Sequence, residues 1–257
     1  MMHILFSWGG FEVHTAPAMA GVSVLIAFLY FRTRSAAAGL SEEDLWTLLS
    51  AMALGVMGGA VLFYAVAYSG GAVESLKTLF VRRQVPGGSF WGSFWVTMLL
   101  AWAYCRARKL AGPPVYDLIA LSAMLALAVM RLGCLANGCC YGMPTGLPWG
   151  VTFTDPRCSV PSALLGVALH PVQLYEAAGC LSVFLAGHFV LLRRARLPHG
   201  GVFVFCVVCY SALRFALDFV RAGGAGLFDG LGLTTAQFIA IFSAAGSLIW
   251  YRMKKKA

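Results

Sequence analysis

Apolar stretches of about 20 residues, the length that lets a helix cross a bilayer, recur along the whole chain. Only 11% of the 257 residues are charged, less than half of the roughly 25% that soluble domains carry, which excludes a soluble globular enzyme. The 60% hydrophobic content equally excludes a disordered chain. We therefore predict an all-α integral membrane protein, a single polytopic domain over residues 1–257 with about seven transmembrane helices. The candidate spans are 16–31, 45–68, 87–105, 115–132, 171–192, 200–219 and 233–251.

The basic residues predict the orientation of these spans. The 19 Lys and Arg residues give a net charge of +9, but they cluster beside apolar stretches, where topology and anionic lipid headgroups explain them without nucleic acid. A cytoplasmic C-terminus places 12 of them inside and 5 outside, so we predict N-out and C-in. Segments 69–86 and 137–169 then form outer-face loops. No basic residue precedes the first apolar stretch, so we expect that helix to be retained rather than cleaved as a signal peptide.

Charged side chains inside the spans indicate where function lies, because a charge at the bilayer centre costs about 2.5 to 3.5 kcal/mol. Asp117 is close to a helix end, where it can simply snorkel or cap. Arg131 ends the same span and leads into RLGCLANGCCYG. Its guanidinium either makes a planar bidentate contact with a phosphate or carboxylate, or snorkels to the interface.

The segment HPVQLYE, residues 170–176, opens the fifth span. Pro171 suits the first helical position, which makes His170 a predicted cap. His170, Gln173 and Glu176 follow one another at intervals of three and so share one helical face. Three polar residues on one face of a membrane-spanning helix favour a functional role for that face.

A third polar group ends the sixth span, where Arg214, Asp218 and Arg221 form a plus, minus, plus stripe on one face. Asp218 can neutralise Arg214 as a structural ion pair. The stripe still keeps one positive charge, which together with Arg131 is available to an anion such as a lipid phosphate.

The eight cysteines fall into two groups. Four lie in or at the ends of apolar stretches, where cysteine behaves as a small hydrophobe. The other four cluster at the predicted outer face, and a disulfide involving Cys158 is the preferred interpretation, with a reactive thiol or a metal site as alternatives. A zinc site fits the C-x4-C-C spacing poorly, so no metal is predicted. The four are Cys134, Cys139, Cys140 and Cys158.

The order and spacing of RLGCLANGCCYG, PWGV, HPVQLYEA and CYSALRFALDFVRAGG resemble the prolipoprotein diacylglyceryl transferase family. The resemblance implies a bacterial inner-membrane enzyme whose site faces the outer leaflet. Such an enzyme moves diacylglycerol from phosphatidylglycerol, a membrane lipid, to the thiol of a lipobox cysteine in a lipoprotein signal peptide, and releases glycerol phosphate. It implies no cofactor, no metal and no nucleic acid partner.

Carried over residue by residue, the resemblance makes Arg131 and Arg221 the catalytic groups that hold the phosphate. His170 is the candidate base, because its unperturbed pKa near 6.5 suits proton transfer at neutral pH, and His14 is a second candidate. The predicted substrate-binding residues are Asn137, Gly142, Gln173, Tyr175, Glu176 and Arg214.

The chain also departs from the family pattern. Cys134 stands in place of an Asn, Cys139 in place of a Glu, and Trp91 in place of the loop His that the family uses. Ala16 and Ala60 stand in place of a Tyr and an Arg. Either another group takes the proton, or the acceptor differs, or catalysis is lost. The alternative functions are therefore a divergent relative with another acceptor, and a non-catalytic lipid-binding, anion-binding or transport protein.

Overall fold

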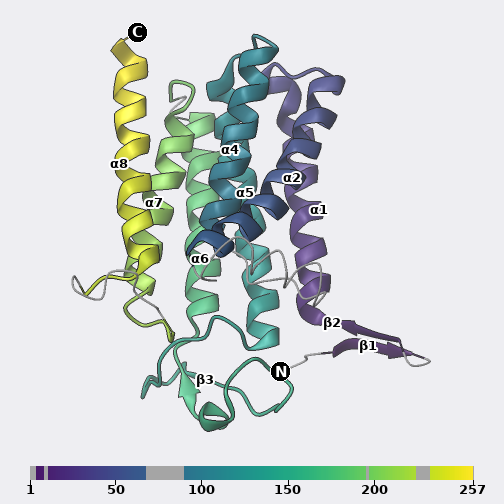
Figure 1. Cartoon of the computed structure of the whole chain (residues 1–257), viewed down its shortest axis with the longest axis vertical. Helices are drawn as coiled ribbons and strands as arrows, with labels where there is room; N and C mark the ends of the chain where they lie inside the picture. Colours follow the sequence, from purple (N-terminus) through teal and green to yellow (C-terminus); the bar gives the residue numbers. More distant parts are fainter. Residues whose placement is uncertain (1–3, 9–10, 68–89, 195–196, 224–231, 257) are drawn as a thin grey trace. The chain divides into compact units, whose positions relative to one another are not determined.

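The computed structural model describes residues 4–8, 11–67, 90–194, 197–223 and 232–256 (Figure 1). The predicted outer segment 69–86 lies outside them. The chain divides into two compact units, which we describe separately. One unit combines Met1–Phe31 with Ile119–Ala257, and the other is Arg32–Leu118.

Each of the seven predicted apolar stretches contains a helix. In the described part of the chain, three segments are long and apolar enough to cross a membrane: Thr15–Ala38, Gly112–Asn137 and Val172–Leu191. The count of seven spans, like the orientation, stays a prediction. The helices are α1 (Thr15–Ser35), α2 (Glu42–Ala67), α4 (Phe90–Ala107), α5 (Gly112–Asn137), α6 (Val172–Leu185), α7 (Gly201–Leu217) and α8 (Thr235–Lys256).

Short strands and irregular turns accompany the helices, so the all-α prediction is incomplete. Two antiparallel pairs form, and they are β1 (Ile4–Trp8) with β2 (Phe11–His14), and β3 (Val151–Thr152) with β4 (Ala168–Leu169). The remaining turns are η1 (Ala36–Ala38), η2 (Ser162–Leu164) and the π-helical η3 (Ala186–Arg194), which continues α6.

In the unit Arg32–Leu118, α2 and α4 pack closely because small residues line their contact. A Cβ on Gly55 would lie 2.6 Å from the Thr97 hydroxyl, and Ser93 donates to the Val56 carbonyl at 2.8 Å. Close backbone approach of this kind is typical of helix pairs in membranes. Asp117 is only 5% exposed, which does not fit the prediction of a side chain that snorkels to the surface.

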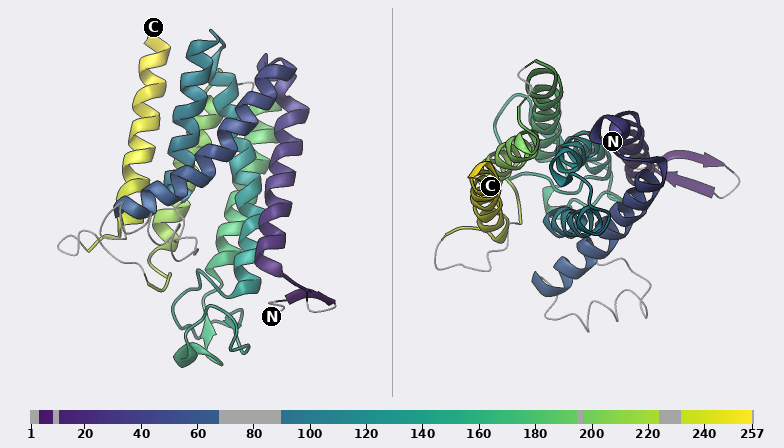
Figure 2. Two further views of the ribbon diagram at one scale, coloured as in Figure 1. Left: turned by 45° about the vertical axis from the view of Figure 1, so that its right-hand side comes forward. Right: turned by 90° about the horizontal axis from the view of Figure 1, so that it is seen from above.

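In the larger unit, α5, α6, α7 and α8 run side by side, and the segment between α5 and α6 extends beyond their ends (Figures 1 and 2). That segment has a core of its own, in which Phe153, Val160 and Leu169 are buried. It is therefore a folded cap on the helix ends, and it can hold polar residues at fixed positions.

Candidate functional site

A buried ion pair joins three helices at the centre of the predicted site. Arg131 on α5 contacts Glu176 on α6 (Nη2 to Oε1, 2.8 Å), and the Tyr210 hydroxyl of α7 donates to the same oxygen at 2.9 Å. Glu176 is 0% exposed. The sequence allows a phosphate or a carboxylate as the partner of Arg131 but does not identify Glu176.

The pair keeps unused hydrogen-bonding capacity. Arg131 Nε and Glu176 Oε2 are buried and have no hydrogen-bond partner among the described residues. The second terminal nitrogen of Arg131 reaches only the Cys134 sulfur, at 3.9 Å. Because buried polar groups are nearly always paired, these orphan atoms indicate room for a polar ligand or water.

A second ion pair stands at the end of α7. Arg214 contacts Asp218 at 2.5 Å, and the Thr234 hydroxyl donates to the other carboxylate oxygen of Asp218. The sequence allowed either a structural ion pair or an anion-binding stripe here, and Arg214 and Asp218 form the ion pair. In contrast, no carboxylate in the described part of the chain pairs with Arg221. The three guanidinium groups and two carboxylates of the site leave one positive charge in excess.

The glycine-rich loop after α5 is held from both sides by backbone hydrogen bonds. Gly142 N donates to the His170 carbonyl at 3.0 Å, and Met143 N donates to the Val220 carbonyl at 2.8 Å. An antiparallel bridge pairs Gly142 with Arg221. A Cβ on Gly142 would lie 2.5 Å from the Cβ of His170, so only glycine fits between these strands.

The HPVQLYE segment differs from its prediction at the helix start. Helix α6 begins at Val172, Pro171 is its N-cap, and no side-chain cap forms there, so the capping role predicted for His170 is wrong. The His170 ring instead lies beside Tyr175 (Nδ1 to Oη, 3.5 Å), and Trp149 Nε1 donates to the same hydroxyl at 2.7 Å. Gln173 is buried and donates to the Cys139 carbonyl at 2.8 Å.

The other predicted residues lie around this centre. Asn137 Nδ2 donates to the Ser159 hydroxyl at 3.0 Å and thereby ties the end of α5 to the cap. His14 is exposed at the end of β2. Trp91 is buried near the start of α4, in the unit Arg32–Leu118.

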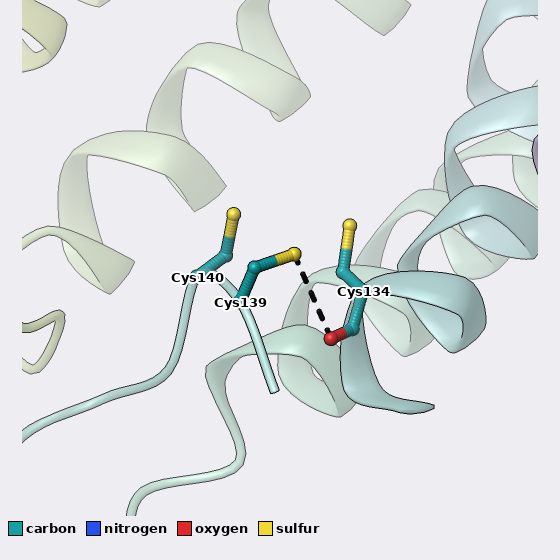
Figure 3. A group of neighbouring side chains, drawn as sticks. All are labelled: Cys134, Cys139 and Cys140. Carbon is teal, nitrogen blue, oxygen red and sulfur yellow. Dashed lines mark hydrogen bonds between the residues drawn. The ribbon is translucent and has the colours of Figure 1, made fainter. Parts of the chain in front are cut away.

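Three of the four cysteines grouped at the predicted outer face come into close contact with one another. All eight cysteines are described and none of them forms a disulfide, so the predicted disulfide involving Cys158 is wrong. The sulfur atoms of Cys134, Cys139 and Cys140 lie within 4.8 Å of one another (Figure 3). The pKa of Cys140 is lowered, chiefly by its side-chain contacts with Cys134 and Cys139 and further by the nearby Arg221 and Arg131. Sequence spacing alone does not predict this contact, because the chain reverses direction between Cys134 and Cys139.

Apolar helices around buried ion pairs, with one positive charge in excess, define a helical membrane protein with a cationic polar site. The chain belongs to the prolipoprotein diacylglyceryl transferase family, whose model matches residues 3–253. Three curated relatives carry the name phosphatidylglycerol–prolipoprotein diacylglyceryl transferase, in one case with the number 2. That of Clostridium tetani is 28% identical over 95% of this chain and 94% of its own. The relative numbered 2 of Clostridium perfringens is 29% identical over 96% of this chain and 93% of its own. The Solidesulfovibrio magneticus relative is 32% identical over 85% of this chain and 80% of its own.

Proposed function

We propose that this chain transfers the diacylglyceryl group of phosphatidylglycerol to the thiol of a prolipoprotein lipobox cysteine. The enzyme lies in a bacterial inner membrane with its site toward the outer leaflet. The observation that carries the proposal is the excess positive charge at Arg131 and Arg221, beside a loop held in one position by backbone pairing. The names of the full-length relatives support the same reaction.

The two arginines act on the leaving phosphate. The acceptor thiolate attacks the glycerol carbon, the carbon–oxygen bond breaks, and negative charge develops on the departing glycerol phosphate. Preorganised donors that meet such charge typically contribute about 10² to 10³ in rate. Arg221 has no carboxylate partner among the described residues, and Arg131 retains its unpaired Nε, so both can donate to the phosphate.

The remaining residues position these groups. Glu176 and Tyr210 fix the Arg131 guanidinium, while Gln173 and Asn137 hold the start of the loop that carries Gly142. Tyr175 and Arg214 complete the substrate-binding set. His170 is the candidate base, at the rim of the site and only partly exposed, with His14 second.

Complementation of a strain depleted of its own diacylglyceryl transferase tests the proposal, with mass spectrometry of a reporter lipoprotein as readout. Arg131→Lys should lower transfer by about 10²-fold, because an ammonium group cannot reproduce the bidentate fork of a guanidinium. The matched control is Arg157→Lys, which changes an exposed arginine of the cap that pairs with Asp155.

Two results would contradict the proposal. Normal transfer by Arg131→Lys would exclude the phosphate-holding role. Absence of any phosphatidylglycerol-dependent product, with the unmodified protein folded in membranes, would exclude the enzyme and favour a lipid-binding or transport role.

A further inference from the structure

The end of α5 explains why three cysteines meet. Gly138, in the left-handed region at φ 69°, follows the helix, and two hydrogen bonds close the turn: Gly138 N to Leu135 O at 3.2 Å and Cys139 N to Cys134 O at 3.1 Å. This pair of bonds is the Schellman motif that reverses the chain at a helix C-terminus. The reversal brings Cys139 back beside Cys134.

The backbone at Cys140 brings in the third sulfur. In an extended chain, neighbouring side chains point to opposite faces. Cys140 has φ 61°, a left-handed conformation that is uncommon for a residue with a Cβ. Its side chain therefore lies on the same side of the loop as that of Cys139, facing the end of α5 that carries Cys134 (Figure 3). Unusual backbone of this kind concentrates at functional sites.

The surroundings hold the cluster in place and favour negative charge there. Gln173 donates to the Cys139 carbonyl, which fixes the loop against α6. The guanidinium groups of Arg131 and Arg221 both act electrostatically on Cys140, and Arg131 also reaches the Cys134 sulfur. Positive charge from two arginines therefore faces the cluster, which favours a bound group with a net negative charge.

We infer that Cys134, Cys139 and Cys140 bind a thiophilic divalent cation, Zn²⁺, through three thiolates and leave a fourth tetrahedral position open. Thiolates at about 2.3 Å from one ion lie about 4 Å from one another, which needs only a small contraction of the observed group. Three protein ligands with an open position are the pattern of catalytic zinc sites. The net negative charge of Zn²⁺ with three thiolates matches the positive excess of the adjacent arginines.

The open position predicts a role for the cation in thiol activation, and this role rests on the proposed function. The acceptor thiol binds there as a thiolate, and its proton leaves to solvent, since a coordinating thiol is deprotonated by the metal. The bound sulfur then forms its bond to the glycerol carbon as the phosphate leaves toward Arg131 and Arg221. The metal thus performs this deprotonation in place of the His170 base that the proposed function names.

Cobalt substitution tests metal binding independently of transfer. The full-length protein is purified in detergent under reducing conditions, its zinc content is measured, and Co²⁺ is added to the metal-free form. We expect one metal per chain and intense thiolate-to-cobalt absorption bands. Less than a tenth of a metal per chain without such bands, or a disulfide within the cluster found by mass spectrometry of the native protein, would overturn the inference.

Matched serine variants locate the site. Cys139→Ser and Cys140→Ser should each weaken Co²⁺ binding at least tenfold, whereas Cys158→Ser, in the same cap but outside the cluster, should bind as the unmodified protein does. Equal binding by all three variants would place the metal elsewhere and overturn the inference.

A lipobox peptide separates failure of the metal site from failure of the proposed function. A peptide with cysteine should shift the cobalt bands, a serine peptide should not, and chelation should lower transfer at least tenfold with recovery on adding Zn²⁺. Metal binding without any transfer would contradict only the proposed function. Transfer that is unaffected by complete metal removal would overturn the role of the cation as a thiol activator.

Discussion

A single carboxylate oxygen of Glu176 accepts hydrogen bonds from both Arg131 and Tyr210. The packing of α5, α6 and α7 at this point therefore depends on one charge. Glu176→Gln removes that charge and leaves a buried guanidinium without compensation. Breaking a buried pair in this way costs about 3 to 5 kcal/mol. We expect a clearly lower unfolding temperature in detergent, measured by thermal denaturation.

The control for this substitution is Tyr210→Phe, which removes one hydrogen bond to the same oxygen and keeps both charges. It should cost about 1.5 to 3 kcal/mol. If Glu176→Gln were no less stable than Tyr210→Phe, the ion pair would contribute little to this unit.

Gly142 permits an equally specific test. Gly142→Ala would place a methyl group 2.5 Å from the Cβ of His170 and 2.7 Å from its carbonyl oxygen, so the loop must move away from His170 and its pairing with Arg221 is disturbed. We expect at least a tenfold loss of transfer, measured with the reporter lipoprotein at matched expression. Gly146→Ala, where nothing lies within 4 Å, should behave as the unmodified protein. Equal effects of the two changes would contradict a role for the Gly142 contact.

Residue types and intervals predicted the polar face, but they did not predict its pairing. The spacing of three placed Gln173 and Glu176 on one face of α6, and both are buried there. The partner of Glu176 is 45 positions away in sequence, and no local pattern specifies such a contact. The sequence groups the cysteines at the outer face but does not predict contact among three of them, because spacing rules assume a simple loop and not the reversal at Gly138.

At the scale of elements, the start of α2 carries a reciprocal cap. Ser41 Oγ donates to Asp44 Oδ2 at 2.6 Å, the Asp44 amide returns a bond to Ser41 Oγ, and the Tyr104 hydroxyl adds a third contact at 2.7 Å. The hydrogen bonds from Ser41 and Tyr104, aided by Arg108, lower the pKa of Asp44 from 3.8 to about 2. The cap stands just before the apolar stretch that begins at Leu45.

This shift predicts how stability depends on pH. Because the folded pKa is the lower one, the stabilisation from Asp44 is fully present above about pH 4 and disappears as the pH falls through about 2. Thermal unfolding of the full chain in detergent between pH 2 and 6 measures the effect. Asp44→Asn should remove this part of the pH dependence, and Glu42→Gln, an exposed neighbour, should keep it. An unchanged profile in Asp44→Asn would contradict the assignment.

The helices themselves were predictable from the lengths of the apolar stretches, since a membrane span has to satisfy its backbone internally. Helix α1 and helix α5 extend beyond their predicted spans because the signal marks only the apolar part of each helix. Strands β3 and β4 were not predicted, because they have two residues each and pair across 15 intervening positions. Such pairs carry no periodic signal.

At the scale of the whole molecule, the bias of basic residues predicts the membrane orientation. A reporter fused to the C-terminus should be active in the cytoplasm, and one inserted at Gly146, in the exposed part of the cap, should be active outside. The reverse pattern at both positions would place the site on the cytoplasmic side and contradict the proposed access of lipoprotein precursors from outside.

The backbone pairing of Gly142 with Arg221 has a consequence for how the protein is made. The loop that follows α5 leaves the ribosome about 80 residues before its partner strand, which at roughly 5 to 20 residues per second is a delay of about 4 to 16 seconds. During that interval the nascent chain has Arg131 and its loop in the membrane, but Arg221 has not yet been synthesised. A chain that stalls or is truncated in this interval therefore cannot assemble the paired loop. The site can form only when synthesis of the chain is nearly complete.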